Sequence, residues 1–186
     1  MGIWELLLLS VGLAMDAFAV SICKGLAMER ITLGRACIPG LWFGGFQGLM
    51  PLIGWFLGSR FASYITAVDH WIAFILLVII GGNMVREAVK GEEEEADSSL
   101  GFKTMLGMAV ATSIDALAVG VTFAFLSVRI LPAVSVIALV TFVISALGVA
   151  IGGVFGAKFQ SKAQVFGGVI LILLGLKILL EGLGVF

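Results

Sequence analysis

The sequence is short of charge, and this absence places it among membrane proteins. Only 12% of its 186 residues are Asp, Glu, Lys or Arg, whereas 61% are hydrophobic. A soluble domain has about a quarter of charged residues and about half of apolar ones. The formal net charge of −1 gives no reason to expect a nucleic acid as a partner. The composition therefore predicts an integral membrane protein.

Residue types that usually carry chemistry are scarce as well. The chain has one His and two Cys, Cys23 and Cys37, which form neither a Cys-x-x-Cys pair nor a zinc-finger spacing. The Gly-x-x-x-x-Gly-Lys-Ser/Thr loop of ATP-hydrolysing proteins is missing, so we expect no use of ATP by this chain. Because no set of nucleophile and base is recognisable, we predict that the protein is not an enzyme and holds no permanently bound cofactor.

What the sequence does contain is six apolar segments long enough to cross a bilayer, since one span needs about 20 residues. The predicted spans lie near residues 3–23, 36–58, 71–89, 104–128, 131–157 and 163–183. The one clearly hydrophilic stretch separates the third span from the fourth and includes four consecutive Glu at residues 92–95. The fold class predicted from this pattern is an all-α polytopic membrane protein with six transmembrane helices.

The second half of the chain repeats the first. The motif AMDAFAV at residues 14–20 returns as SIDALAV at residues 113–119, and FLGSRF at 56–61 returns as VFGAKF at 154–159. Each repeat then has three spans, and an odd number makes the second repeat enter the membrane in the opposite direction. We predict two inverted three-helix repeats, residues 1–90 and 104–186, joined by an acidic cytoplasmic loop at 91–103.

Basic residues predict the orientation of these repeats. Eight of them lie in the loops between spans one and two, three and four, and five and six, against three on the opposite side. Because loops that are rich in Lys and Arg stay in the cytoplasm, both termini are predicted to lie outside it. The eight are Lys24, Arg30, Arg35, Arg86, Lys90, Lys103, Lys158 and Lys162, and the three are Arg60, Arg129 and Lys177.

Each copy of the repeated motif places one Asp near the middle of a predicted span. A carboxylate there costs roughly 2.5–3.5 kcal/mol on insertion scales, so Asp16 and Asp115 are candidate functional residues. We expect no Lys or Arg at the same depth, and the two acids therefore need protons or an imported cation. Two carboxylates neutralise a divalent cation, and oxygen ligands suit hard ions such as Mn²⁺, Mg²⁺ and Ca²⁺.

Other polar side chains are weaker candidates for the same metal site. Gln47, near the centre of the second span, could supply an oxygen ligand or a hydrogen bond between helices. Thr112 and Ser113 precede the second motif's Asp, and a hydroxyl bonded back to its own helix is the favoured role for both. Glu87 and Glu181 hold matching positions in the two repeats near helix ends, which makes them candidates for a gate or an exit.

With these motifs the chain resembles the MntP family of manganese efflux pumps, which is related to the LysE group of small exporters. The resemblance rests on AMDAFAV at residues 14–20 and TSIDALAV at residues 112–119, and it covers essentially the whole chain. It implies a bacterial inner-membrane protein that exports Mn²⁺ as its transported substrate. Of the family's essential residues, only the aspartates carry over, onto Asp16 and Asp115.

Both lines together predict a secondary-active transporter in the lipid bilayer. Mn²⁺ would enter from the cytoplasm, bind between Asp16 and Asp115 and leave when the repeats rock outward, with protons as a counter-ion for the return. Three alternatives stay open: a passive channel for divalent cations, an exporter of another metal, and an exporter of a small organic solute. The last should need a basic group for a substrate carboxylate, and no such group is expected within the membrane.

Overall fold

The computed structural model describes residues 2–28, 31–60, 100–155 and 158–183, together with part of the stretch 71–89. All regular elements in these ranges are α-helices, so the all-helical prediction is confirmed. The helices described over their whole length are α1 (Ile3–Ala27), α2 (Leu33–Ser59), α4 (Phe102–Ala111), α5 (Ile114–Phe125), α6 (Ile130–Phe155) and α7 (Lys158–Gly182). The predicted third span and the acidic loop fall largely outside the described residues.

Three of these helices are long and apolar enough to cross a membrane. The qualifying stretches are Ile3–Leu26 of α1, Leu33–Ser59 of α2 and Ile130–Gly153 of α6. The pair α4 and α5 counts as a fourth if a bent helix is taken as one span. Large apolar side chains such as Leu41, Leu131 and Leu139 are exposed on the outer surfaces of α2 and α6, which suits contact with lipid.

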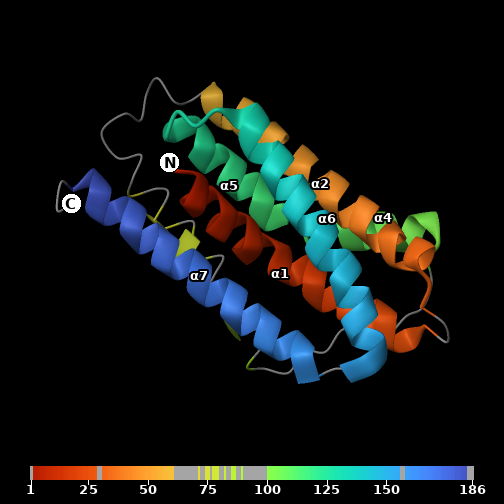
Figure 1. Cartoon of the computed structure of the whole chain (residues 1–186). Helices are drawn as coiled ribbons and strands as arrows, with labels where there is room; N and C mark the ends of the chain where they lie inside the picture. Colours follow the sequence, from red (N-terminus) through yellow and green to blue (C-terminus); the bar gives the residue numbers. More distant parts are fainter. Residues whose placement is uncertain are drawn as a thin grey trace.

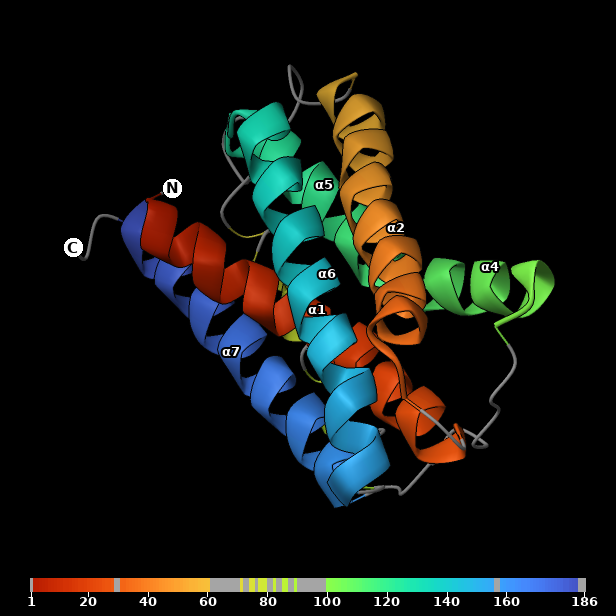
Figure 2. The ribbon, with the colours of Figure 1, turned by 45° about the vertical axis from the view of Figure 1, so that its right-hand side comes forward.

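The predicted fourth span is not one continuous helix, and this is a correction. The axes of α4 and α5 differ by 45° at a break formed by Thr112 and Ser113. Both hydroxyls donate hydrogen bonds to carbonyl oxygens of α4, and such bonds compete with the helix and bend it. Figure 2 shows the result: α4 points away from the bundle, whereas α5 runs beside α2. By contrast, α2 stays continuous although it contains Pro39 and Pro51.

Glycines bring the helix backbones into direct contact. A Cβ on Gly152 of α6 would collide with the carbonyl oxygen of Ile22 in α1, and a Cβ on Gly54 of α2 would collide with that of Leu117 in α5. Small residues of this kind are what membrane helices use to pack closely. Helix α1 consequently lies in the middle of the bundle, with α7 on one side and α6 on the other (Figure 1).

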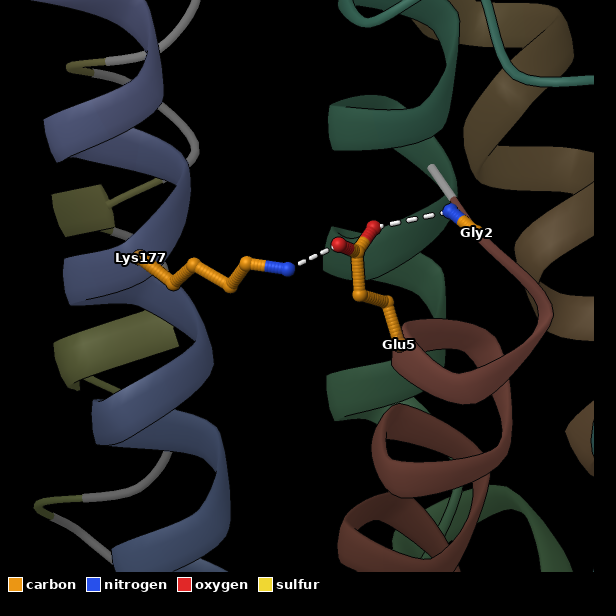
Figure 3. A network of polar contacts seen from close by, with 3 residues as sticks. All are labelled: Gly2, Glu5 and Lys177. Carbon is orange, nitrogen blue, oxygen red and sulfur yellow. Dashed lines mark hydrogen bonds and ion pairs between the residues drawn. The ribbon is translucent and has the colours of Figure 1, made fainter. Parts of the chain in front are cut away.

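The start of α1 and the end of α7 lie at the same end of the bundle (Figures 1 and 2). An ion pair between Glu5 of α1 and Lys177 of α7 connects them there. The second carboxylate oxygen of Glu5 accepts a hydrogen bond of 2.9 Å from the backbone N–H of Gly2, so that Glu5 stands between the two partners (Figure 3). A cavity of 410 Å³ opens at this end, between the first turn of α1 and the connection from α5 to α6.

Candidate metal site

The two motif aspartates come from two helices, α1 and α5, and their charges interact. Asp16 is in the middle of α1, and Asp115 is the second residue of α5. Oδ1 of Asp16 and Oδ2 of Asp115 are both buried, and the two carboxylates are close enough to interact as charges. The structure therefore brings together the acids of the two motif copies, which are far apart in the sequence.

The break between α4 and α5 shapes the surroundings of Asp115. Oδ1 of Asp115 accepts a hydrogen bond of 2.8 Å from the backbone N–H of Ala116, in the first turn of α5. A helix N-terminus carries a partial positive charge, which favours a carboxylate at this position. Discontinuous helices that offer such ends to charged groups are a recurring feature of transporter binding sites. Asp16 has no equivalent end beside it in its own chain segment, because α1 is continuous.

Gln47 of α2 connects the two aspartate-bearing segments. Its side chain is fully buried, and its Nε2 donates hydrogen bonds to the carbonyl oxygens of Leu13, at 2.9 Å, and Thr112, at 3.2 Å. Leu13 precedes Asp16 by three residues, and Thr112 precedes Asp115 by three residues. The two acceptors are thus equivalent positions of the repeated motif. The predicted hydrogen bond between helices is confirmed, and the role as a metal ligand stays a prediction.

The hydroxyls of Thr112 and Ser113 are bonded back to α4, as the favoured interpretation predicted. Oγ1 of Thr112 donates to the carbonyl oxygen of Met108 at 2.9 Å, and Oγ of Ser113 donates to that of Ala109 at 2.5 Å. Of the two glutamates expected near a gate, Glu87 lies outside the described residues. Glu181 belongs to α7, but its side chain lies outside them as well.

Sequence reasoning missed one buried cation and several buried hydroxyls. Lys24 was assigned to the loop after the first span, yet it lies within the last turn of α1 and is 1% exposed. The signal that was available is the continuation of the apolar pattern beyond residue 23. The hydroxyls of Ser21, Thr141 and Ser145 are also buried, with no hydrogen-bond partner in the part of the chain that the structure describes.

Two apolar clusters lie along the helices on either side of the aspartate positions. The first apolar cluster is formed by residues before Asp16 on α1 and after Asp115 on α5, with additions from α6, α7 and residue 77. Its members are Leu6, Leu9, Leu13, Met15, Leu77, Val119, Phe123, Ala133, Ile137 and Leu174. The second apolar cluster lies after Asp16 on α1 and before Asp115 on α4, with one residue from α2. It comprises Ala17, Val20, Phe43, Met105 and Ala109.

Two residues of the first apolar cluster also line the cavity at the end of the bundle. Leu6 and Ala133 belong to both, and Arg129 and Ser127 stand among the other lining residues. Ser127 has a φ of 52°, a left-handed backbone conformation that is uncommon outside glycine. The cavity therefore approaches the aspartates from the end where α1 begins, and apolar packing separates it from them.

The chemistry available to this site is that of oxygen ligands. Among the described residues no group of three or more His, Cys, Asp and Glu side chains comes together. An ion between Asp16 and Asp115 would therefore complete its coordination with neutral oxygens from amides, carbonyls, hydroxyls or water. Such a set suits hard divalent cations rather than soft ones.

Comparisons with protein families and with individual proteins point to the same family. The model of a family described as "Putative manganese efflux pump" matches residues 30–179. A protein of Desulfitobacterium hafniense named "Putative manganese efflux pump MntP" is 61% identical over 184 residues, which cover 99% of this chain and 97% of that protein. A protein of Acetivibrio thermocellus with the same name is 57% identical over 97% of this chain and 92% of its own length. No solved structure matches the chain.

Proposed function

This chain belongs to the MntP family of manganese efflux pumps, as the sequence motifs predicted, and we propose that it exports Mn²⁺ from the cytoplasm. The ion would bind between Asp16 and Asp115. The observation that supports this proposal is that these two carboxylates, each with a buried oxygen, lie close enough for their charges to interact. Two buried negative charges are costly in a membrane unless they serve a cation or protons.

The proposed architecture is a pair of inverted repeats, residues 1–90 and 104–186, joined by the loop 91–103. Support comes from the glycine contacts. Gly54 of α2 packs on α5 and Gly152 of α6 packs on α1, so the second helix of each half packs on the first helix of the other half. Reciprocal contacts of this kind are expected when two similar halves are related by a two-fold axis.

The proposed transport mode is secondary-active, with alternating access rather than a continuous pore. The first apolar cluster includes residues before Asp16 and after Asp115, and the second includes residues after Asp16 and before Asp115, so apolar packing lies in both directions along these helices. A channel would need an open path through at least one of these clusters. Protons are the proposed counter-ion, because an empty site with two ionised carboxylates is expensive to reorient in lipid.

The proposed location is the bacterial inner membrane, with both termini outside the cytoplasm. The uneven distribution of basic residues supports this orientation. The start of α1 and the end of α7 lie together at one end of the bundle, which accords with termini on the same side (Figure 2). The cavity lined by Arg129 and Leu6 would then face outward and serve as the exit.

Transport by the purified protein in proteoliposomes tests the function. Uptake of Mn²⁺, Mg²⁺, Ca²⁺, Zn²⁺ and Cd²⁺ would be compared with and without an imposed pH gradient, using protein-free liposomes as the control. We expect Mn²⁺ to accumulate above its external concentration only when the pH gradient is present, because a proton antiporter couples the two fluxes.

Each other outcome would indicate a different function for this protein. Flux that stops when the concentrations are equal would indicate a passive channel. Preferential transport of another ion would indicate a different metal as substrate. The absence of flux for all five ions would reject metal export and return attention to small organic solutes.

A further inference from the structure

One amide side chain holds the two halves of the proposed metal site together. Gln47 comes from α2, while its two acceptors belong to α1 and to the break between α4 and α5. Its two hydrogen bonds thus join the segment before Asp16 to the segment before Asp115. The contact is therefore a cross-connection between the elements that carry Asp16 and Asp115.

The orientation of this amide is dictated by its partners. Backbone carbonyl oxygens only accept hydrogen bonds, so the group that meets Leu13 and Thr112 has to be the NH₂ end of Gln47. Turning the amide over would set its Oε1 against two other oxygens. With both N–H groups engaged, Oε1 is left on the other side, buried and without a hydrogen bond among the described residues.

The position of Gln47 within α2 is equally constrained. It lies between Gly44 and Gly48, which press the helix against Ala138 of α6. A Cβ on Gly44 would stand 2.7 Å from the carbonyl oxygen of Ala138, so α2 has no room to shift in this direction. The side chain thus reaches its two acceptors from a fixed helix.

We propose that Gln47 is a positioning residue that sets the separation of the two aspartates and thereby the affinity for the transported ion. The inference rests on the proposed function, because it takes the ion to bind between Asp16 and Asp115. Each of the two bonds fixes a carbonyl one helical turn before an aspartate. Removing both lets α1 and α5 take different relative positions and leaves a metal-binding pair with a less defined spacing.

The test measures the Mn²⁺ concentration for half-maximal transport, K½, separately from the maximal rate. Gln47→Met keeps the length of the side chain but removes both donors. We expect K½ to rise about tenfold, which corresponds to the loss of two hydrogen bonds of about 0.6 kcal/mol each. The change in maximal rate should be smaller. Ser59→Ala, an exposed position on the same helix, is the matched control and should leave both quantities unchanged.

A second variant guards against loss of folding. Gln47→Asn keeps the amide but is one methylene shorter, so it cannot reach both carbonyls, and its K½ should also rise. An unchanged K½ in either folded variant, or a lower maximal rate at constant K½, would overturn the positioning role. The wild-type protein measured in parallel separates the two proposals: if it does not transport Mn²⁺, the proposed function itself has failed.

Discussion

At the scale of single residues, some members of the candidate site contribute their side chains and others contribute backbone atoms. Asp16 and Asp115 offer carboxylates, whereas Thr112 takes part through its carbonyl oxygen, which accepts from Gln47. The hydroxyl of Thr112 is turned toward α4 and donates to Met108. This division means that the type of side chain matters at the aspartates and the position of the backbone matters at Thr112.

Replacing the hydroxyl of Thr112 tests this division. Thr112→Val keeps the shape of the side chain and the carbonyl but removes a hydrogen bond worth about 0.6 kcal/mol in a membrane protein. We expect K½ for Mn²⁺ to stay within about twofold of wild type, measured by uptake into proteoliposomes.

Ser113→Ala is the companion variant, because its hydroxyl is also bonded back to α4. If either substitution weakened Mn²⁺ transport as strongly as the loss of an aspartate, the hydroxyl would act either as a ligand or through the bend that it supports beside Asp115. The expectation of a small effect would then be wrong.

At the scale of helices, glycine contacts decide how closely the elements approach. Gly54 of α2 meets the backbone of Leu117 in α5, and backbone atoms cannot move aside as a flexible side chain can. Gly45 of the same helix has open space where its Cβ would lie. The two glycines therefore differ in their contribution to packing although both belong to α2.

Gly54 and Gly45 allow a matched test of helix packing. Gly54→Ala should lower the free energy of unfolding by about 1–3 kcal/mol, because the added methyl forces α2 and α5 apart. Gly45→Ala should be neutral or slightly stabilising, since Ala favours a helix. Thermal unfolding of the purified variants in one detergent measures both, and equal effects at the two positions would contradict the packing described here.

Helical periodicity and length were enough to predict α1, α2 and α6, because long apolar runs have few alternatives in a membrane. They were not enough for the break at Thr112 and Ser113. A Ser or Thr hydroxyl can bond back within a straight helix as well as at a bend, so its presence does not reveal which occurs. The prolines of α2 would have been the more obvious place for a break, yet tertiary packing keeps that helix whole.

The aspartates of the candidate metal site could be predicted from the sequence, but the hydrogen bonds around them could not. The duplicated motif singled out Asp16 and Asp115 because intramembrane acids are rare. It could not show that Gln47 bonds to the carbonyl before each of them, since backbone acceptors have no signature in a sequence. The burial of Lys24 was missed because the end of a helix near the membrane surface is poorly defined by hydropathy alone.

At the scale of the whole molecule, the two halves meet at the aspartates. The acids of both motif copies lie close enough for their charges to interact, and Gln47 of α2 bonds to the backbone before each of them. We therefore expect that neither half binds a divalent ion by itself. The central claim is therefore that Asp16 and Asp115 form a single site to which each contributes one charge.

The most direct test compares Mn²⁺ transport by Asp16→Asn, Asp115→Asn and the double variant in proteoliposomes. Asn is nearly isosteric with Asp, so the variants lose a charge with little change in packing, and Ser59→Ala again serves as the control. We predict that each single variant loses transport by at least about 100-fold and that the double variant is no worse, as expected for residues that act as a unit. Substantial Mn²⁺ transport by either single variant, or by the double variant, would contradict the account.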